Sequence, residues 1–236
     1  MRHPQTVVAN DGVAANGPIT ADNPDFWLTG NDGMPLSLSN PTHITVGLAP
    51  VGTTIGGVTV SNVLDTQEIT LLKAATQIWE SLANVQFQLV DSSTTVPDIS
   101  VGLADLNSMQ LIGYTESSWN SRDQFLPGTL TLLEDPAETS VTTLENGDLR
   151  YNGLTTTMLQ VLEHELGHAL GLGHNQVDIA SIMHPVIGAN DPVPDANDIV
   201  ALQSVYGAPS AAPVLSAGDL GTLHALLANT NLNYLA

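Results

Sequence analysis

The feature that most constrains this 236-residue chain is the segment His-Glu-Leu-Gly-His-Ala-Leu-Gly-Leu-Gly-His at positions 164–174. His164 and His168 are four residues apart, so on a helix both imidazoles project from one face and can bind the same metal ion. Gly171 stands where a non-helical backbone angle would end the helix and bring His174 round to that ion. The pattern predicts a zinc site of three histidines, which leaves one position for water.

Glu165 follows His164 directly, and consecutive helical side chains diverge by about 100°. Its carboxylate therefore flanks the predicted site. There it can take the proton of a metal-activated water and return it to a leaving amine, which together amount to amide hydrolysis. The alternative is that the three histidines serve packing or capping. We disfavour it because apolar helices seldom carry three histidines without a ligand.

The composition of the chain excludes or disfavours several other classes of function. The chain has no cysteine, which excludes disulfides, thiolate ligands and a cysteine nucleophile. A formal net charge of −20 disfavours nucleic acid and anionic membrane surfaces as partners. No apolar run is long enough to cross a bilayer, and no secretory signal is visible in residues 1–10.

Hydrophobic periodicity predicts alternating strands and helices. Strands are predicted at 42–48, 85–90, 99–103, 129–133 and 148–151, and helices at 65–82, 155–172 and 195–206. The helix between the first two strands implies a right-handed parallel crossover, so the sheet begins parallel. We expect residues 105–128 and 134–147 to form loops, because they show little periodicity.

The histidine segment and the Ser-Ile-Met-His-Pro segment at 181–185 together resemble the metzincin zinc site with its methionine turn. Residues 195–207 are similar to the closing helix of the matrixin and serralysin branches, and 75–79 and 98–101 resemble their first helix and third strand. The resemblance implies an α/β, zincin-like fold. Its parts are a mixed, twisted five-stranded sheet, two long helices including the active-site helix, and a small C-terminal subdomain with one helix. Met183 would be the structural methionine beneath the metal.

The same resemblance implies three regions and a function. Residues 1–41 would be an extended N-terminal arm resembling a pro-segment, 42–207 the catalytic domain, and 208–236 a linker with a short helical tail. The expected activity is that of a secreted, extracellular zinc endopeptidase acting on extended protein substrates. We assign the substrate-pairing sheet edge to the segment matching the family's fourth strand, Thr129, Leu130, Thr131, Leu132 and Leu133. His184 is expected to line the substrate cleft.

The resemblance also bears on cofactors and regulation. We expect one catalytic zinc, and no second zinc of the matrixin kind, because residues 105–128 contain no histidine. Calcium is a further candidate, with oxygen ligands offered by Asp123, Glu134, Asp135, Glu145 and Asp148. The N-terminal arm is a candidate self-inhibitor, with one of Asp22, Asp25 and Asp32 on the metal in place of a cysteine.

Two other functional classes compete with this interpretation. One is a zinc-stabilised module that binds peptides without cutting them, and Glu165 argues against it because such a module has no use for a base. The other is an inhibitor-like or adhesion domain with an incidental metal, for which the acidic surface is the only support.

Overall fold

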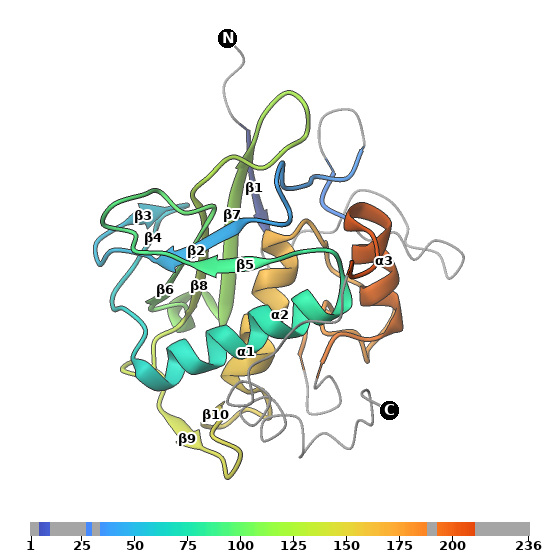
Figure 1. Ribbon diagram of the computed structural model, residues 1–236. Coiled ribbons are helices and arrows are strands. Elements are labelled where there is room, and N and C mark those ends of the chain that lie inside the picture. Colours follow the sequence, from blue (N-terminus) through green and yellow to red (C-terminus); the bar gives the residue numbers. More distant parts are fainter. Residues whose placement is uncertain (1–4, 10–26, 30–33, 188–192, 211–236) are drawn as a thin grey trace.

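The main sheet of the computed structural model has the strand order β1-β7-β8-β6-β2-β5 (Figure 1). These strands are β1 Gln5–Ala9, β2 Ile44–Leu48, β5 Phe87–Leu89, β6 Ile99–Ala104, β7 Gly113–Trp119 and β8 Thr129–Glu134. The strands β5, β2, β6 and β8 run parallel, β7 is antiparallel to β8, and β1 is antiparallel to β7. The predicted mixed sheet and its parallel crossover are confirmed. The predicted strand at 148–151 lies outside this sheet, and β7 takes the fifth place. The N-terminal arm adds β1 as a sixth strand.

The structure describes residues 5–9, 27–29, 34–187 and 193–210. The three arm aspartates proposed to cap the metal, Asp22, Asp25 and Asp32, lie outside these ranges. So does most of the predicted linker and tail at 208–236. Within the described ranges, no helix combines the length and apolar character needed to span a membrane.

Each of the three α-helices begins at a capping box, in which two side chains satisfy backbone N–H groups reciprocally. The helices are α1 Thr66–Leu82, α2 Met158–Ala169 and α3 Ala196–Tyr206. Their caps are the pairs Asp65 and Glu68, Thr157 and Gln160, and Asp195 and Asp198. All three predicted helices are confirmed. However, α2 is shorter than the predicted 155–172, because Thr157 is extended and Gly171 has a positive φ.

Helices α1 and α2 cover one face of the main sheet (Figure 1). Buried apolar side chains of β2 and β6 pack there against those of the two helices, among them Ile44, Val46, Ile99, Val101, Leu71, Leu72, Leu162 and Leu166. The opposite face packs against the hairpin of β3 Thr54–Ile55 and β4 Val58–Thr59. The sheet is therefore buried on both sides, as parallel strands require.

The prediction of a surface loop at 105–128 is wrong, because this segment contains a short 3₁₀ helix at Asn107–Met109 and the whole of β7. All of β7 is buried except the partly exposed Ser118. One glycine and two serines weaken its strand signal, and its pairing with β8 overrides that weakness. The expected loop at 134–147 likewise contains β9 Val141–Thr143, which pairs with the predicted short strand, β10 Leu149–Tyr151.

The position of β7 also corrects the expected substrate-pairing edge. The segment Thr129, Leu130, Thr131, Leu132 and Leu133 belongs to β8, which pairs with β6 on one side and with β7 on the other. Its backbone groups are therefore already used within the sheet, so a peptide cannot add to it. The strand on that side of β8 is β7, and the outer edge of β7 pairs with β1.

Part of the N-terminal arm belongs to the core around α2. Leu28 N donates to Gly171 O at 2.7 Å, and Trp27 Nε1 donates to Ala201 O at 3.2 Å. The side chain of Leu36 is fully buried beside Phe125. The predicted arm therefore contacts the turn after α2 through Leu28 and contacts α3 through Trp27.

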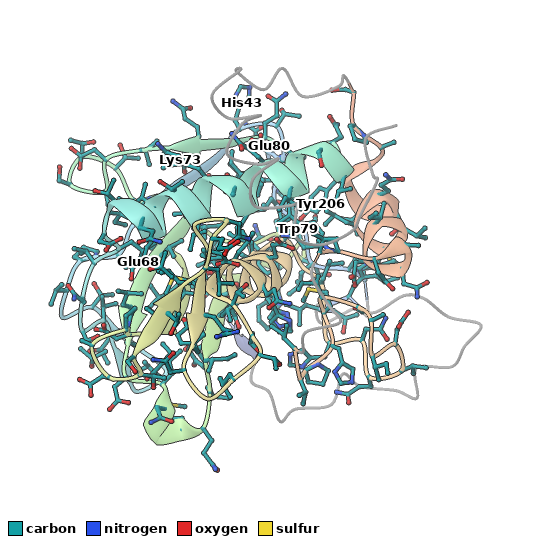
Figure 2. The ribbon with its side chains drawn as sticks, turned by 90° about the horizontal axis from the view of Figure 1, so that it is seen from below. His43, Glu68, Lys73, Trp79, Glu80 and Tyr206 are labelled. Carbon is teal, nitrogen blue, oxygen red and sulfur yellow. The ribbon has the colours of Figure 1, made fainter. Side chains whose placement is uncertain are left out.

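Two large side chains hold α2 from the neighbouring helices (Figure 2). Trp79 of α1 donates through Nε1 to Glu163 O at 3.0 Å. Tyr206 of α3 donates through its hydroxyl to Leu170 O at 2.7 Å and accepts from Leu38 N at 3.1 Å. Helix α2 is therefore fixed by hydrogen bonds to its backbone as well as by apolar packing.

We predict that Tyr206→Phe lowers the free energy of unfolding by about 1–3 kcal/mol, because Leu170 O and Leu38 N both lose their partner in a buried place. Urea unfolding followed by circular dichroism measures the change. The control is Thr54→Val, which removes an exposed hydrogen bond between the hydroxyls of Thr54 and Thr59. It should leave the free energy of unfolding nearly unchanged. A Tyr206→Phe protein as stable as wild type would contradict this role of the hydroxyl.

Candidate metal centre

Three buried histidines converge on one point, two from α2 and one from the segment after it. His168 Nε2 lies 3.0 Å from His164 Nε2 and 3.2 Å from His174 Nε2. Two nitrogen ligands of a tetrahedral zinc, each about 2.0–2.1 Å from the ion, would be about 3.3 Å apart. Among the described residues, this is the one group of three or more His, Cys, Asp or Glu side chains close enough to hold a metal ion.

The opposite nitrogens of two of these rings are fixed by backbone carbonyls. His164 Nδ1 lies 2.6 Å from Ile182 O, and His168 Nδ1 lies 2.8 Å from Leu172 O. A carbonyl oxygen only accepts, so each Nδ1 carries the proton and each Nε2 presents a lone pair. The lone pairs then point at one another across about 3 Å, which is repulsive unless a cation lies between them. The donor set fits zinc.

Electrostatics keep these imidazoles neutral. Burial lowers the pKa of His164 to about 3, assisted by His174, and it lowers the pKa of His174 to about 4. Burial also holds the pKa of His168 well below its ordinary value. Neutral imidazole is the form that binds a metal, so the site is ready for a cation at neutral pH.

The turn after α2 brings His174 to the other two histidines. Gly171 has φ = 102°, as predicted, and a Cβ at this position would collide with Leu36 O. Leu172 N donates to Gly167 O at 2.9 Å, which closes the turn. Any side chain at position 171 would therefore be strained in its backbone and would clash with the arm.

The methionine turn lies directly beneath α2. Met183 is fully buried, and a Cβ on Gly167 would collide with its Sδ. The turn is held by Asp198 of α3, whose carboxylate accepts from Ser181 Oγ at 2.5 Å and from Ile182 N at 3.0 Å. Burial raises the pKa of Asp198 to about 7, against the lowering effect of these bonds. Asp198 thus positions the carbonyl of Ile182 that orients His164.

Glu165 is buried and points toward β7 of the sheet. Its Oε2 accepts from Thr115 Oγ1 at 2.6 Å. On the same strand, a Cβ on Gly113 would collide with Glu165 Oε1, so only glycine leaves room for the carboxylate. The predicted base is therefore enclosed between α2 and β7.

Glu163 is an unexpected feature of α2. Its side chain is fully buried, and its two carboxyl oxygens have no hydrogen-bond partner within the described part of the chain. Burial raises its pKa well above the ordinary value, with further increases from Asp148 and Asp198. Burial thus favours the protonated form of this carboxyl group.

His184 lies beside the three converging histidines but is not one of the group that could hold a metal ion. Its ring is close enough to His164 and His174 for its charge to lower the pKa of both. Its Nδ1 lies 2.9 Å from Val186 O and 3.2 Å from Val186 N, and the ring is partly exposed. A contact between His184 and substrate stays a prediction.

Three of the carboxylates considered for calcium accept hydrogen bonds from backbone N–H groups. Glu134 Oε2 accepts from Leu106 N at 2.6 Å, Asp135 Oδ1 accepts from Ala137 N at 2.9 Å, and Asp148 Oδ1 accepts from Leu149 N at 2.7 Å. These bonds give the carboxylates a structural role. A calcium site stays a prediction from the sequence.

The residues that sequence reasoning missed lie around the histidines. Thr115 and Gly113 lay in the expected loop, where the strand propensity of Tyr114, Thr115 and Trp119 was the signal that could have indicated a strand. Asp198 was detectable as the acidic third residue of a capped helix, but its reach to Ile182 depends on tertiary packing.

The matrixin family model matches residues 58–207. Among curated proteins, matrix metalloproteinase-25 of Mus musculus is 31% identical over 151 residues, which are 61% of this chain and 24% of that protein. The hatching enzyme of Paracentrotus lividus is 26% identical over 203 residues, 84% of this chain and 33% of that protein. Metalloendoproteinase 1-MMP of Arabidopsis thaliana is 28% identical over 141 residues, 58% and 37% of the two chains. The chain thus spans a quarter to just over a third of these relatives.

We predict that Glu163→Met stabilises the protein by about 1–3 kcal/mol at pH 8, because it removes a buried carboxyl group that has no hydrogen-bond partner among the described residues. The gain should shrink toward pH 4. The folded carboxyl keeps its proton while the unfolded one ionises above its ordinary pKa, so the wild type loses stability as pH rises through that window. Urea unfolding at pH 4.5, 6 and 8 measures this difference.

The control for this experiment is Glu138→Met, which changes an exposed glutamate in the same way. Because this side chain is exposed, the substitution should change the free energy of unfolding by less than about 0.5 kcal/mol. A Glu163→Met protein that is less stable than wild type at pH 8 would show that the carboxyl group has a partner in solution.

Proposed function

Because the chain belongs to the matrixin family, we propose that it is a zinc-dependent endopeptidase that hydrolyses peptide bonds of extended protein substrates. The observation that carries this proposal is the convergence of three neutral imidazole nitrogens within 3.0 and 3.2 Å, with Glu165 on the same helix. Metal ligands alone would suit a structural site. The added buried carboxylate is what suits hydrolysis.

His164, His168 and His174 would hold the zinc, which when bound supplies Lewis acidity and lowers the pKa of a coordinated water. Glu165 accepts the proton of the attacking water and then delivers it to the leaving amine. The bonds from His164 to Ile182 O and from His168 to Leu172 O keep the ligand rings from rotating.

The substrate would pair with the outer edge of β7. This edge already accepts an extended antiparallel segment, β1, in a register that runs from Gln5 opposite Trp119 to Ala9 opposite Thr115. A peptide in the same place would pass close to Glu165, because Thr115 contacts that carboxylate. Strand addition supplies backbone hydrogen bonds that do not depend on the substrate sequence.

A zinc-stabilised module that binds peptides without cutting them is the second candidate. It would use the same histidines and the same sheet edge. It offers no reason for Gly113 to leave space for the carboxylate of Glu165. An extracellular place of action and a calcium requirement stay predictions from the sequence resemblance.

We predict that Glu165→Ala abolishes proteolysis on a casein or gelatin zymogram, lowering activity at least a hundredfold, while one zinc per chain is retained. The base is lost but the three ligands remain. Elemental analysis of the folded protein measures the zinc, and a chelator should inactivate the wild type.

His168→Ala is the matched variant on the same helix. It should lose both the zinc and the activity, because His168 contacts both other ligands. Wild-type protein that holds stoichiometric zinc but cuts no better than Glu165→Ala would favour the non-catalytic module. Wild-type protein without stoichiometric zinc would contradict both the endopeptidase and the non-catalytic module.

The N-terminal arm would restrain the enzyme by covering the edge of β7. Support comes from the five paired positions between β1 and β7. The last of them pairs Ala9 with Thr115, the residue that contacts Glu165. A substrate needs the same backbone groups, so the two compete. The earlier hypothesis of an arm aspartate on the metal is separate and stays a prediction.

We predict that deleting residues 1–9 raises kcat/KM for a long peptide substrate severalfold, mainly through a lower KM, because the competing strand is gone. Continuous cleavage of a fluorogenic peptide measures both constants. The control is deletion of residues 1–4, which keeps β1. Deletion of the whole arm is a poor test, since Trp27 and Leu36 belong to the core. An unchanged KM after removal of β1 would refute the competition.

A further inference from the structure

A hydroxyl group from the sheet reaches the carboxylate that we assign as the base. Thr115 Oγ1 of β7 lies 2.6 Å from Glu165 Oε2 and 3.2 Å from Glu165 O. Both residues are almost fully buried, Thr115 at 2% and Glu165 at 2% exposure. Water competes little with this hydrogen bond, so it is stronger than a similar bond at the surface.

The hydroxyl group of Thr115 can donate one hydrogen bond, and the Glu165 carboxylate is the preferred acceptor. The carboxylate oxygen is the shortest contact, and a charged acceptor gives the stronger bond. Thr131 Oγ1, on the paired position of β8, lies 3.2 Å from Thr115 Oγ1. When Thr115 donates to Glu165, Thr131 can donate to Thr115. The two strands then form a short chain of hydroxyls that ends on the carboxylate.

The rest of the surroundings leaves the carboxylate little freedom. Gly113, two residues before Thr115 on the same face of β7, is close to Oε1 and has no side chain to give way. The other oxygen is held by Thr115. Rotation of the carboxylate would break the bond to Thr115, and movement of Oε1 would meet the backbone of β7.

We propose that Thr115 is a positioning residue that holds the Glu165 carboxylate in its working orientation, with Thr131 directing the hydroxyl proton. This inference rests on the proposed endopeptidase function. Thr115 acts through Glu165 and does not itself contact the reacting atoms. Correct orientation of a base lowers the barrier of the chemical step and leaves substrate binding unchanged.

The test compares Thr115→Val with Thr115→Ser in the full-length, zinc-loaded protein. Valine keeps the shape and removes the donor, so kcat should fall about tenfold with KM unchanged. Serine restores the hydroxyl, so it should recover most of kcat. Thr131→Val should cause a smaller loss in kcat, because Thr115 keeps its donor but loses the group that directs it. A fluorogenic peptide gives kcat and KM, and elemental analysis confirms the zinc.

The matched control is Thr45→Val on β2, which breaks a threonine–carboxylate hydrogen bond of 2.7 Å to Asp98 away from the metal centre. It should keep wild-type kcat. The proposal is overturned if Thr115→Val has wild-type kcat, if Thr115→Ser is as slow as the valine variant, or if Thr45→Val loses as much. If Thr115→Val does not fold, the other two variants still test the proposal. A wild-type kcat in Thr131→Val together with a low kcat in Thr115→Ser would contradict it.

Failure of the underlying function gives a different result. In that case the wild type is no more active than Glu165→Ala, and the proposal for Thr115 falls with it. If the wild type is active and Glu165→Ala is not, the endopeptidase function stands whatever the threonine variants show.

Discussion

The metal centre depends on one arrangement of hydrogen bonds, in which backbone carbonyls hold the outer nitrogens of two histidines. Ile182 O and Leu172 O fix the protons on Nδ1 of His164 and His168, so the two Nε2 lone pairs must face inward. Burial then keeps the rings neutral, with the pKa of His164 lowered to about 3. Without a cation this arrangement is unfavourable, because lone pairs face each other at 3.0 Å in a region without solvent. The fold therefore builds the site at a cost that metal binding offsets.

The surrounding structure holds the carbonyls and the helix in place. Asp198 binds the methionine turn that carries Ile182 O, and Tyr206 binds the end of α2 through Leu170 O. Trp79 binds the middle of the same helix. These contacts are buried and polar, so each is costly to break. The backbone oxygen of Glu163 accepts the bond from Trp79, whereas its two carboxyl oxygens have no hydrogen-bond partner among the described residues.

Strand β7 links the metal centre to the sheet. Its outer edge offers backbone groups for an extended chain, and its inner face contacts Glu165 through Thr115 and Gly113. The sequence analysis placed the edge at β8 because Thr129 to Leu133 was matched to the fourth strand of the resembling family. A strong apolar pattern is what a strand paired on both sides requires, whereas an edge strand can hold glycine and serine. The pattern was therefore correct for a strand and wrong for its place in the sheet.

The sequence by itself determined the three histidines of the candidate site, the glycine that ends their helix and the three helices. These features follow from local spacing: four residues along a helix set His164 and His168 on one face, and a glycine allows the positive φ at position 171. Only the tertiary structure decided which strand lies at the edge, which threonine meets Glu165, and which carbonyls orient the histidines. Thr115 and Glu165 are 50 residues apart, and His164 and Ile182 are 18 apart. Contacts over such separations depend on how whole elements pack, and no local pattern records them.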